Sequence, residues 1–168
     1  EGFVNILPRR GVVVNTLTVQ DIKEFYQILG ALENTAILKA SPSLSEKEIK
    51  RMKELNDQMN KAIKKDDFDT YYERNLKFHD IYLKLSGNKT LRKTADILKK
   101  RLYDFPRREG YIKKWEETSI NEHEEFIRLV ETKKYQEAAD FIRDIHWSFK
   151  VQEKYIRQYY SENPEQNR

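Results

Sequence analysis

The spacing of hydrophobic and polar positions changes once along the chain. Residues 3–7 and 12–14 are runs rich in β-branched residues on either side of the turn-forming segment 8–11, and this pattern predicts a β-hairpin. An isolated two-stranded hairpin is only marginally stable in water, so we expect it to have been part of a larger unit that precedes the chain. After Leu17, apolar residues recur every three or four positions, which is the period of an α-helix.

Capping and turn signals divide the helical region into segments. Thr18 with Asp21 and Ser45 with Glu48 have the spacing of helix N-caps, and Gly87 can adopt the left-handed conformation that ends a helix. Because the links between segments are short, we predict an all-α fold, an antiparallel bundle of six or seven helices preceded by the short β-hairpin. The predicted helices cover residues 18–40, 45–65, 68–85, 89–103, 115–132 and 135–160.

This pattern predicts three regions. Residues 1–16 form the hairpin and a linker, residues 17–160 form the helical domain, and residues 161–168 form a frayed polar tail.

Composition excludes several classes of protein. Of the 168 residues, 36% are charged and none is cysteine, which excludes disulfide scaffolds and thiolate metal sites. The longest stretch without a charged residue, 11–20, is much shorter than the roughly 20 apolar residues of a transmembrane helix. The start of the chain does not resemble a signal peptide, so we expect a cytoplasmic protein. A net charge of +4 is too balanced to indicate a nucleic-acid surface by itself.

The three histidines are the strongest candidates for a functional site. His79, His123 and His146 lie in three different predicted helices, each among the apolar positions of its helix. Asn75 precedes His79 by one helical turn and therefore shares its face. If these faces meet inside the bundle, three imidazoles and one amide oxygen can hold a divalent transition metal such as zinc, nickel or manganese.

The three histidines also have a purely structural explanation. A single buried histidine is usually a core residue that is satisfied by one hydrogen bond. Three buried titratable rings in one small core are costly without a common ligand. On spacing alone, both interpretations stay open.

Several motifs together resemble a known family. Segments 25–33 and 75–79, the Ser-Gly-Asn stop at 86–88, the Glu-His pair ending at His123, and His146 are similar to motifs of the FCD effector domain. This domain occurs in GntR-type bacterial transcription regulators of the FadR subfamily. The resemblance implies that Asn75, His79, His123 and His146 hold one divalent metal.

The start of the chain resembles another part of these regulators. Residues 2–14 are similar to the wing of the winged-helix DNA-binding domain, which the family carries before the FCD domain. The resemblance implies that Arg9 and Arg10 lie at the tip of the wing and contact DNA. Recognition of DNA would then belong to a winged helix N-terminal to this chain.

Two positions depart from the family pattern. The first metal ligand is normally an aspartate, and here it is Asn75, whose amide oxygen is a weaker donor than a carboxylate. An arginine of the first effector-domain helix is replaced by Leu29. We therefore expect Arg92, Lys99 and Arg101 to provide the cations that bind the effector.

These features favour a regulator over an enzyme. We expect an effector-sensing, metal-binding and dimerisation domain of a GntR/FadR-type regulator. A small carboxylate metabolite would bind at the buried metal and shift the DNA affinity of a homodimer. The alternative is a metal-dependent hydrolase in which Glu122 or Glu125 is the general base. A metal-free bundle with a purely structural role is a third interpretation.

Overall fold

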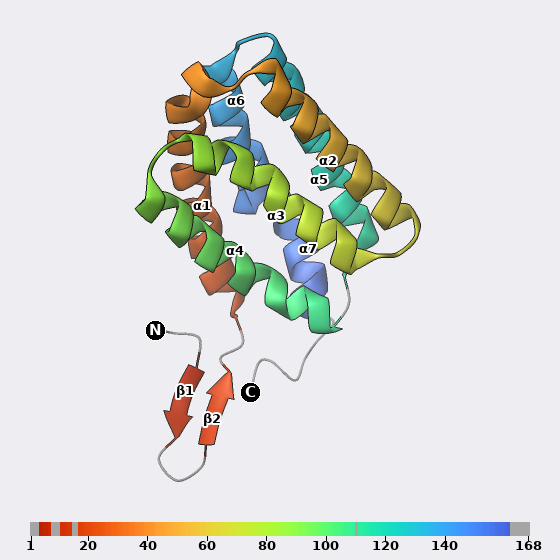
Figure 1. The fold of residues 1–168 in the computed structure, drawn as a ribbon. Coiled ribbons are helices and arrows are strands. Elements are labelled where there is room, and N and C mark those ends of the chain that lie inside the picture. Colours follow the sequence, from red (N-terminus) through yellow and green to blue (C-terminus); the bar gives the residue numbers. More distant parts are fainter. Residues whose placement is uncertain (1–3, 8–10, 15–16, 110, 162–168) are drawn as a thin grey trace.

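The helices form an antiparallel bundle, so the predicted all-α class is confirmed. The computed structural model describes residues 4–7, 11–14, 17–109 and 111–161 (Figure 1). The helical elements are α1 (Val19–Ala40), the 3₁₀ segment η1 (Ser41–Ser43), α2 (Glu46–Lys64), α3 (Phe68–Leu85), α4 (Lys89–Glu109), α5 (Lys113–Glu131), α6 (Tyr135–Phe141), the π-helical segment η2 (Ile142–His146) and α7 (Phe149–Ser161).

Local sequence signals explain where the first three helices begin and end. At the start of α1, the Asp21 backbone N–H donates to Thr18 Oγ1 at 3.1 Å, and the Thr18 N–H donates to Asp21 Oδ2 at 2.8 Å. Ser45 and Glu48 form the same capping box at α2. Gly87, with a φ of 70°, follows the end of α3, as the left-handed stop requires. The predicted bounds of these helices are therefore confirmed.

Two later boundaries were predicted wrongly. The sequence predicts that the fourth helix ends near Tyr103, but α4 continues through Pro106 to Glu109. A proline removes one backbone donor, and neighbouring turns can still hold the helix together. The last predicted helix is interrupted between α6 and α7 by η2, where the Trp147 N–H donates to the Ile142 carbonyl at 2.9 Å. Such π-type turns are frequent at functional sites.

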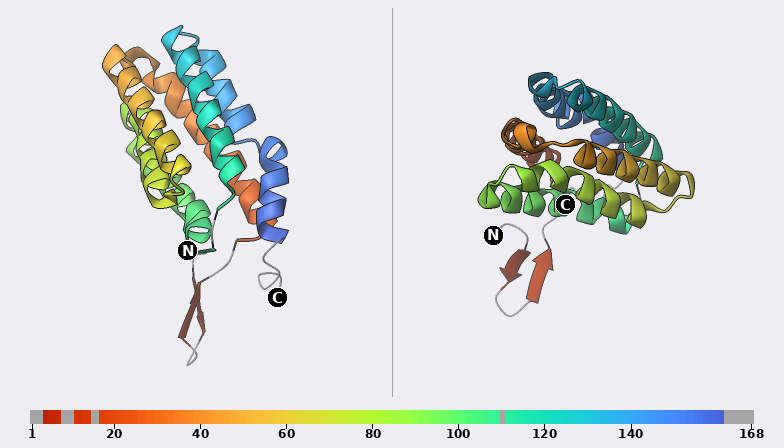
Figure 2. Two further views of the ribbon diagram at one scale, coloured as in Figure 1. Left: turned by 90° about the vertical axis from the view of Figure 1, so that its right-hand side faces the viewer. Right: turned by 45° about the horizontal axis from the view of Figure 1, so that its top comes forward.

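A strand pair precedes the bundle. β1 (Val4–Leu7) pairs antiparallel with β2 (Gly11–Val14). The pair lies outside the helical body (Figures 1 and 2). Arg9 and Arg10, and the predicted tail from 162 onward, lie outside the described residues. The described residues give no support for a wing origin, which stays a prediction.

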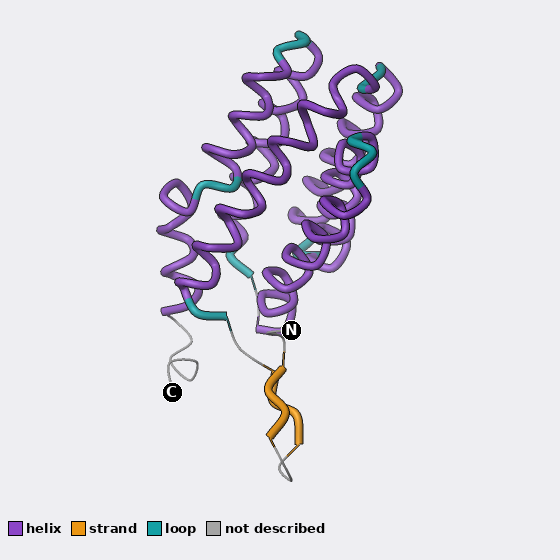
Figure 3. Tube along the Cα trace, turned by 90° about the vertical axis from the view of Figure 1, so that its left-hand side faces the viewer, coloured by secondary structure: helices purple, strands orange, loops and turns teal. Residues whose placement is uncertain are grey.

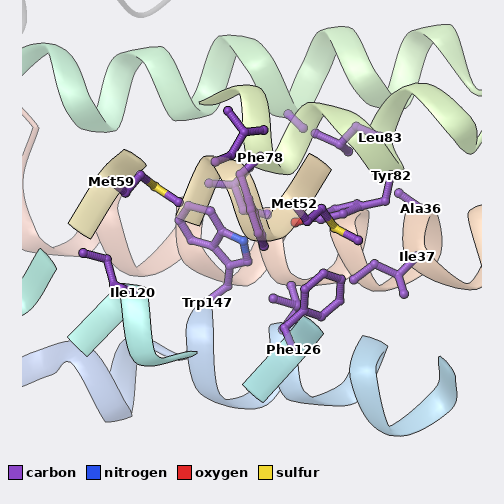
Figure 4. Packing of buried hydrophobic residues seen from close by; sticks show 14 of the residues in the cluster. Ala36, Ile37, Met52, Met59, Phe78, Tyr82, Leu83, Ile120, Phe126 and Trp147 are labelled. Carbon is purple, nitrogen blue, oxygen red and sulfur yellow. The ribbon is translucent and has the colours of Figure 1, made fainter. Parts of the chain in front are cut away.

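α1 runs through the bundle and contacts α3, α4, α6, η2 and α7, while α2 packs on α3 and α5. Figure 3 shows that most connections are short turns at the ends of the bundle. Large apolar side chains fill the space between these helices (Figure 4); Met52, Phe78, Tyr82, Phe126 and Trp147 are all buried. None of the described helices is long and apolar enough to cross a membrane.

Candidate metal centre

Three imidazole rings meet in the centre of the bundle, as predicted. His79 comes from α3, His123 from α5 and His146 from η2, and all three are buried. One ring nitrogen of each lies within 4.8 Å of those of the other two, and the ring centroids are 5.0 to 5.2 Å apart. The cluster therefore has the geometry of a three-histidine metal site.

A hydrogen bond fixes the outer nitrogen of each ring. His79 Nδ1 lies 2.8 Å from Glu33 Oε2, and His146 Nδ1 lies 2.8 Å from Glu122 Oε2. His123 Nδ1 lies 3.3 Å from Asn56 Oδ1. Because each of these oxygens accepts a hydrogen bond, the ring proton belongs on Nδ1. Nε2 then keeps a free lone pair, as metal-bound histidines require.

Among the described residues, two inner nitrogens of the cluster and one oxygen on the same face of α3 as His79 lack hydrogen-bond partners. His79 Nε2, His123 Nε2 and Asn75 Oδ1 are buried without a hydrogen bond in the part of the chain that the structure describes. The Asn75 amide is held by its other end, since Nδ2 donates to the Tyr103 hydroxyl at 2.9 Å. Buried polar atoms without partners are costly. A divalent cation accepts the lone pairs of such atoms, so the residues present fit a metal.

Burial also favours the neutral form of the imidazole rings. Desolvation lowers the pKa of His79 to about 4, although the Glu33 carboxylate opposes this shift. Desolvation, together with the other two histidines, lowers the pKa of His123 well below its usual range. Both rings are therefore neutral near pH 7, which is the form that binds metals.

Glu33 is a site residue that the sequence pattern did not reveal. Besides His79, its fully buried carboxylate accepts hydrogen bonds from the Tyr82 hydroxyl at 2.6 Å, Trp147 Nε1 at 2.8 Å and Lys99 Nζ at 2.9 Å. Burial alone would raise the pKa of Glu33, but His79 and Lys99 hold it well below its usual value. The available signal was an acidic residue within the apolar stripe of its helix.

The three predicted effector-binding cations have different surroundings. Lys99 is buried and paired with Glu33. Arg92 forms two hydrogen bonds with Asp80, at 2.6 and 2.7 Å, on the surface of the bundle. The Arg101 guanidinium lies 5.2 Å from the centroid of the Phe25 ring. Lys99 is thus linked to His79 through the shared Glu33 carboxylate, whereas Arg92 and Arg101 make the other contacts described. The role of all three in effector binding stays a prediction.

A cavity of about 50 Å³ adjoins His146 at the end of the bundle where α1 begins and α7 ends. Its described lining contains two carboxylates, Glu116 and Glu122, and no lysine or arginine. The lining also includes Ile22 and Tyr26 from the first turns of α1. A small molecule in this cavity would therefore contact both the histidine cluster and α1.

The two glutamates proposed as general base are committed to other contacts. Besides holding His146, Glu122 accepts a hydrogen bond from Gln152 Nε2 at 2.8 Å. Glu125 forms an ion pair with Arg128 at 2.6 Å on the surface. Neither carboxylate is placed as a free base beside a metal-bound water.

Solved structures show the same fold. E. coli McbR/YncC is 16% identical, with a TM-score of 0.75 over 95% of this chain and 77% of that chain. Lar, which controls the expression of the Listeria monocytogenes agr system and mediates virulence, is 14% identical, with a TM-score of 0.68 over 95% of this chain and 74% of that chain. No curated protein sequence matches significantly.

A family model identifies the chain more closely. The model of the FCD domain matches residues 24–146, a range that contains the three histidines, Asn75 and Glu33. FCD domains are the effector-binding domains of GntR/FadR-type transcription regulators and form a non-enzymatic family, so the hydrolase alternative is wrong. On the fold, the histidine cluster and this match, the chain belongs to the FCD domain family.

Proposed function

We propose that the chain is the effector-sensing, metal-binding and dimerisation domain of a GntR/FadR-type DNA-binding transcription regulator. The observation that carries the proposal is the convergence of three buried imidazoles whose outer nitrogens are fixed. Two of their inner nitrogens, and Asn75 Oδ1, are unsatisfied. An apolar core would not keep these atoms in this arrangement without a ligand.

The ligand set would be Asn75, His79, His123 and His146. When bound, a divalent ion such as zinc, nickel or manganese supplies a Lewis-acidic centre with positions for the oxygen of a small carboxylate metabolite. Glu33, Glu122 and Asn56 hold the rings in the metal-binding tautomer. The cavity beside His146 gives the metabolite its place.

The position of the cavity explains how effector binding could change DNA binding. Ile22 and Tyr26 line it from the first turns of α1, and α1 follows β2 closely in the chain. An effector that prefers one position of α1 would shift the population of arrangements available to a DNA-binding unit joined there. In a homodimer, this shift would change the relative position of two winged helices, with Arg9 and Arg10 at the DNA backbone.

The first prediction tests the ligand set. His123→Ala should lose stoichiometric metal after dialysis, measured by elemental analysis, and should lose the rise in melting temperature on adding metal, because a ligand that binds only the folded state stabilises it. The matched control is Ile127→Ala, which shortens a buried side chain one turn further along α5 and leaves all three histidines in place. This control should lose about 2–4 kcal/mol of stability and keep its metal. Full metal content in His123→Ala would contradict the assignment.

A further inference from the structure

We propose that the cavity beside His146 selects an effector that carries a protonated amine, held by the Glu116 carboxylate and the aromatic rings around it. The inference rests on the proposed function, because it concerns the same cavity. It adds a chemical class: a small molecule with a carboxylate at the metal end and an ammonium group at the Glu116 end, as in an amino acid.

Glu116 differs from the other buried glutamates. Glu33 is paired with Lys99, and Glu122 is held by His146 and Gln152. Glu116 is 8% exposed and lines the cavity, yet it has no ion pair in the described part of the chain.

The surroundings of Glu116 compensate its charge only in part. Burial raises its pKa to about 7, and the nearby Tyr71 hydroxyl opposes this shift only in part. A buried carboxylate in this state is stabilised by a cation that enters the cavity.

The walls of the cavity suit an organic cation. They are largely aromatic: Tyr26, Tyr103, Tyr111, Trp115, Trp147 and Tyr159. Ring faces attract ammonium groups, and the attraction strengthens when water is excluded. A second carboxylate on the effector would meet no lysine or arginine in the described lining, and it would face Glu116. The small volume, about 50 Å³, favours a compact molecule.

Calorimetric titration of the metal-loaded protein tests the proposal. The probes are glycine, 3-aminopropanoate and 4-aminobutanoate, each compared with the monocarboxylate and the dicarboxylate of matched length. The amino acid whose length spans the cavity should bind about tenfold more tightly than the monocarboxylate or the dicarboxylate of the same length. Glu116→Gln should reduce this ratio to about one. The control Glu117→Gln alters an exposed neighbour on α5 and should keep the ratio.

Propylamine added to the metal-free protein separates this inference from the proposed function. Glu116→Gln should weaken propylamine binding whether or not the histidines hold a metal. If carboxylates bind equally with and without metal while propylamine still depends on Glu116, the proposed metal role fails and the amine site stands. The amine site is overturned if the mono- or dicarboxylate of matched length binds as tightly as every amino acid, or if no amine-bearing probe binds. It is also overturned if Glu116→Gln still binds the amino acid more tightly than the matched carboxylates.

Discussion

At the scale of single residues, the three histidines differ in the group that accepts the hydrogen bond from Nδ1. His79 and His146 have carboxylate partners at 2.8 Å, whereas His123 has an amide partner at 3.3 Å. A carboxylate behind an imidazole raises its basicity and fixes its orientation more strongly than an amide does. The three proposed ligands therefore differ in basicity and in how firmly they are held, although all three are imidazoles.

Glu122→Gln should weaken metal binding by about 10- to 100-fold, because the amide keeps an acceptor for His146 Nδ1 but loses the charge that supports the ring. Competition with a chelating dye measures the change. Glu124→Gln, an exposed neighbour on α5, is the matched control and should bind metal as the parent chain does. Equal affinities in Glu122→Gln and the parent chain would show that Glu122 does not tune the ligand.

Asn75→Asp should tighten metal binding, because a carboxylate neutralises part of the charge of the ion. For the same reason, acetate or citrate should add less to the affinity of this variant than to that of the parent chain. Metal titrations with and without these anions measure both effects. Asn121→Asp places the same change on an exposed position of α5 and serves as control. If Asn75→Asp binds metal no better than the control, Asn75 is not a ligand.

At the scale of elements, one buried ion pair joins several helices. Glu33 on α1 binds Lys99 on α4, Tyr82 on α3 and Trp147 after η2. The bond to His79 connects the same carboxylate to the metal centre. The arrangement of the helices and the geometry of the site therefore depend on the same side chain.

Glu33→Gln should lower the free energy of unfolding of the metal-free protein by about 3–5 kcal/mol, because it leaves the Lys99 ammonium buried without a counter-charge. Adding Lys99→Met removes that charge and should recover much of the loss. Glu73→Gln breaks the exposed pair with Lys77 and should cost about 1 kcal/mol or less. Urea unfolding measures all three. A loss in Glu33→Gln no larger than in this control, or no recovery in the double variant, would contradict the role of the pair.

At the scale of the whole molecule, one cavity is lined by residues of the histidine cluster, the start of α1 and the final helix. Tyr26 on α1, Gln152 on α7 and Glu116 on α5 all line it. The Glu116 carboxylate therefore lies where α1, α5 and α7 meet.

The pKa of Glu116 predicts how the stability of the fold changes with pH. Its value rises from 4.5 to about 7 on folding, so the folded state binds more protons between these values than the unfolded state. The contribution of Glu116 to stability is fully present below 4.5 and is lost as pH rises through 7. Glu116→Gln should remove this loss. At pH 8, the free energy of unfolding of this variant should exceed that of the parent chain by about 1–3 kcal/mol. Urea unfolding at pH 6 and 8 measures the slope, with Glu117→Gln as control; an unchanged slope in Glu116→Gln would contradict the prediction.

The sequence by itself determined the local features of this protein. Helix starts at Thr18 and Ser45 and the stop at Gly87 depend on contacts three or four residues apart, and spacing reveals such contacts directly. The apolar faces that carry His79, His123 and His146 follow the same short period. That is why the all-α class could be predicted from spacing, whereas the convergence of the three histidines stayed open on spacing alone and was expected from the family resemblance.

Only the tertiary structure decided what each face meets. Glu33 and Lys99 are 66 positions apart, and no local pattern pairs a buried acid with a buried lysine at such a distance. The sequence therefore predicted Lys99 as an effector-binding cation without revealing its pairing with Glu33. The π-helical turn before Trp147 is also set by packing rather than by propensity, so the pattern predicted an unbroken helix there. Glu116 and Glu122 lie on the same helix and both line the cavity, and only the three-dimensional packing distinguishes them. Glu122 holds His146, whereas Glu116 has no ion pair among the described residues.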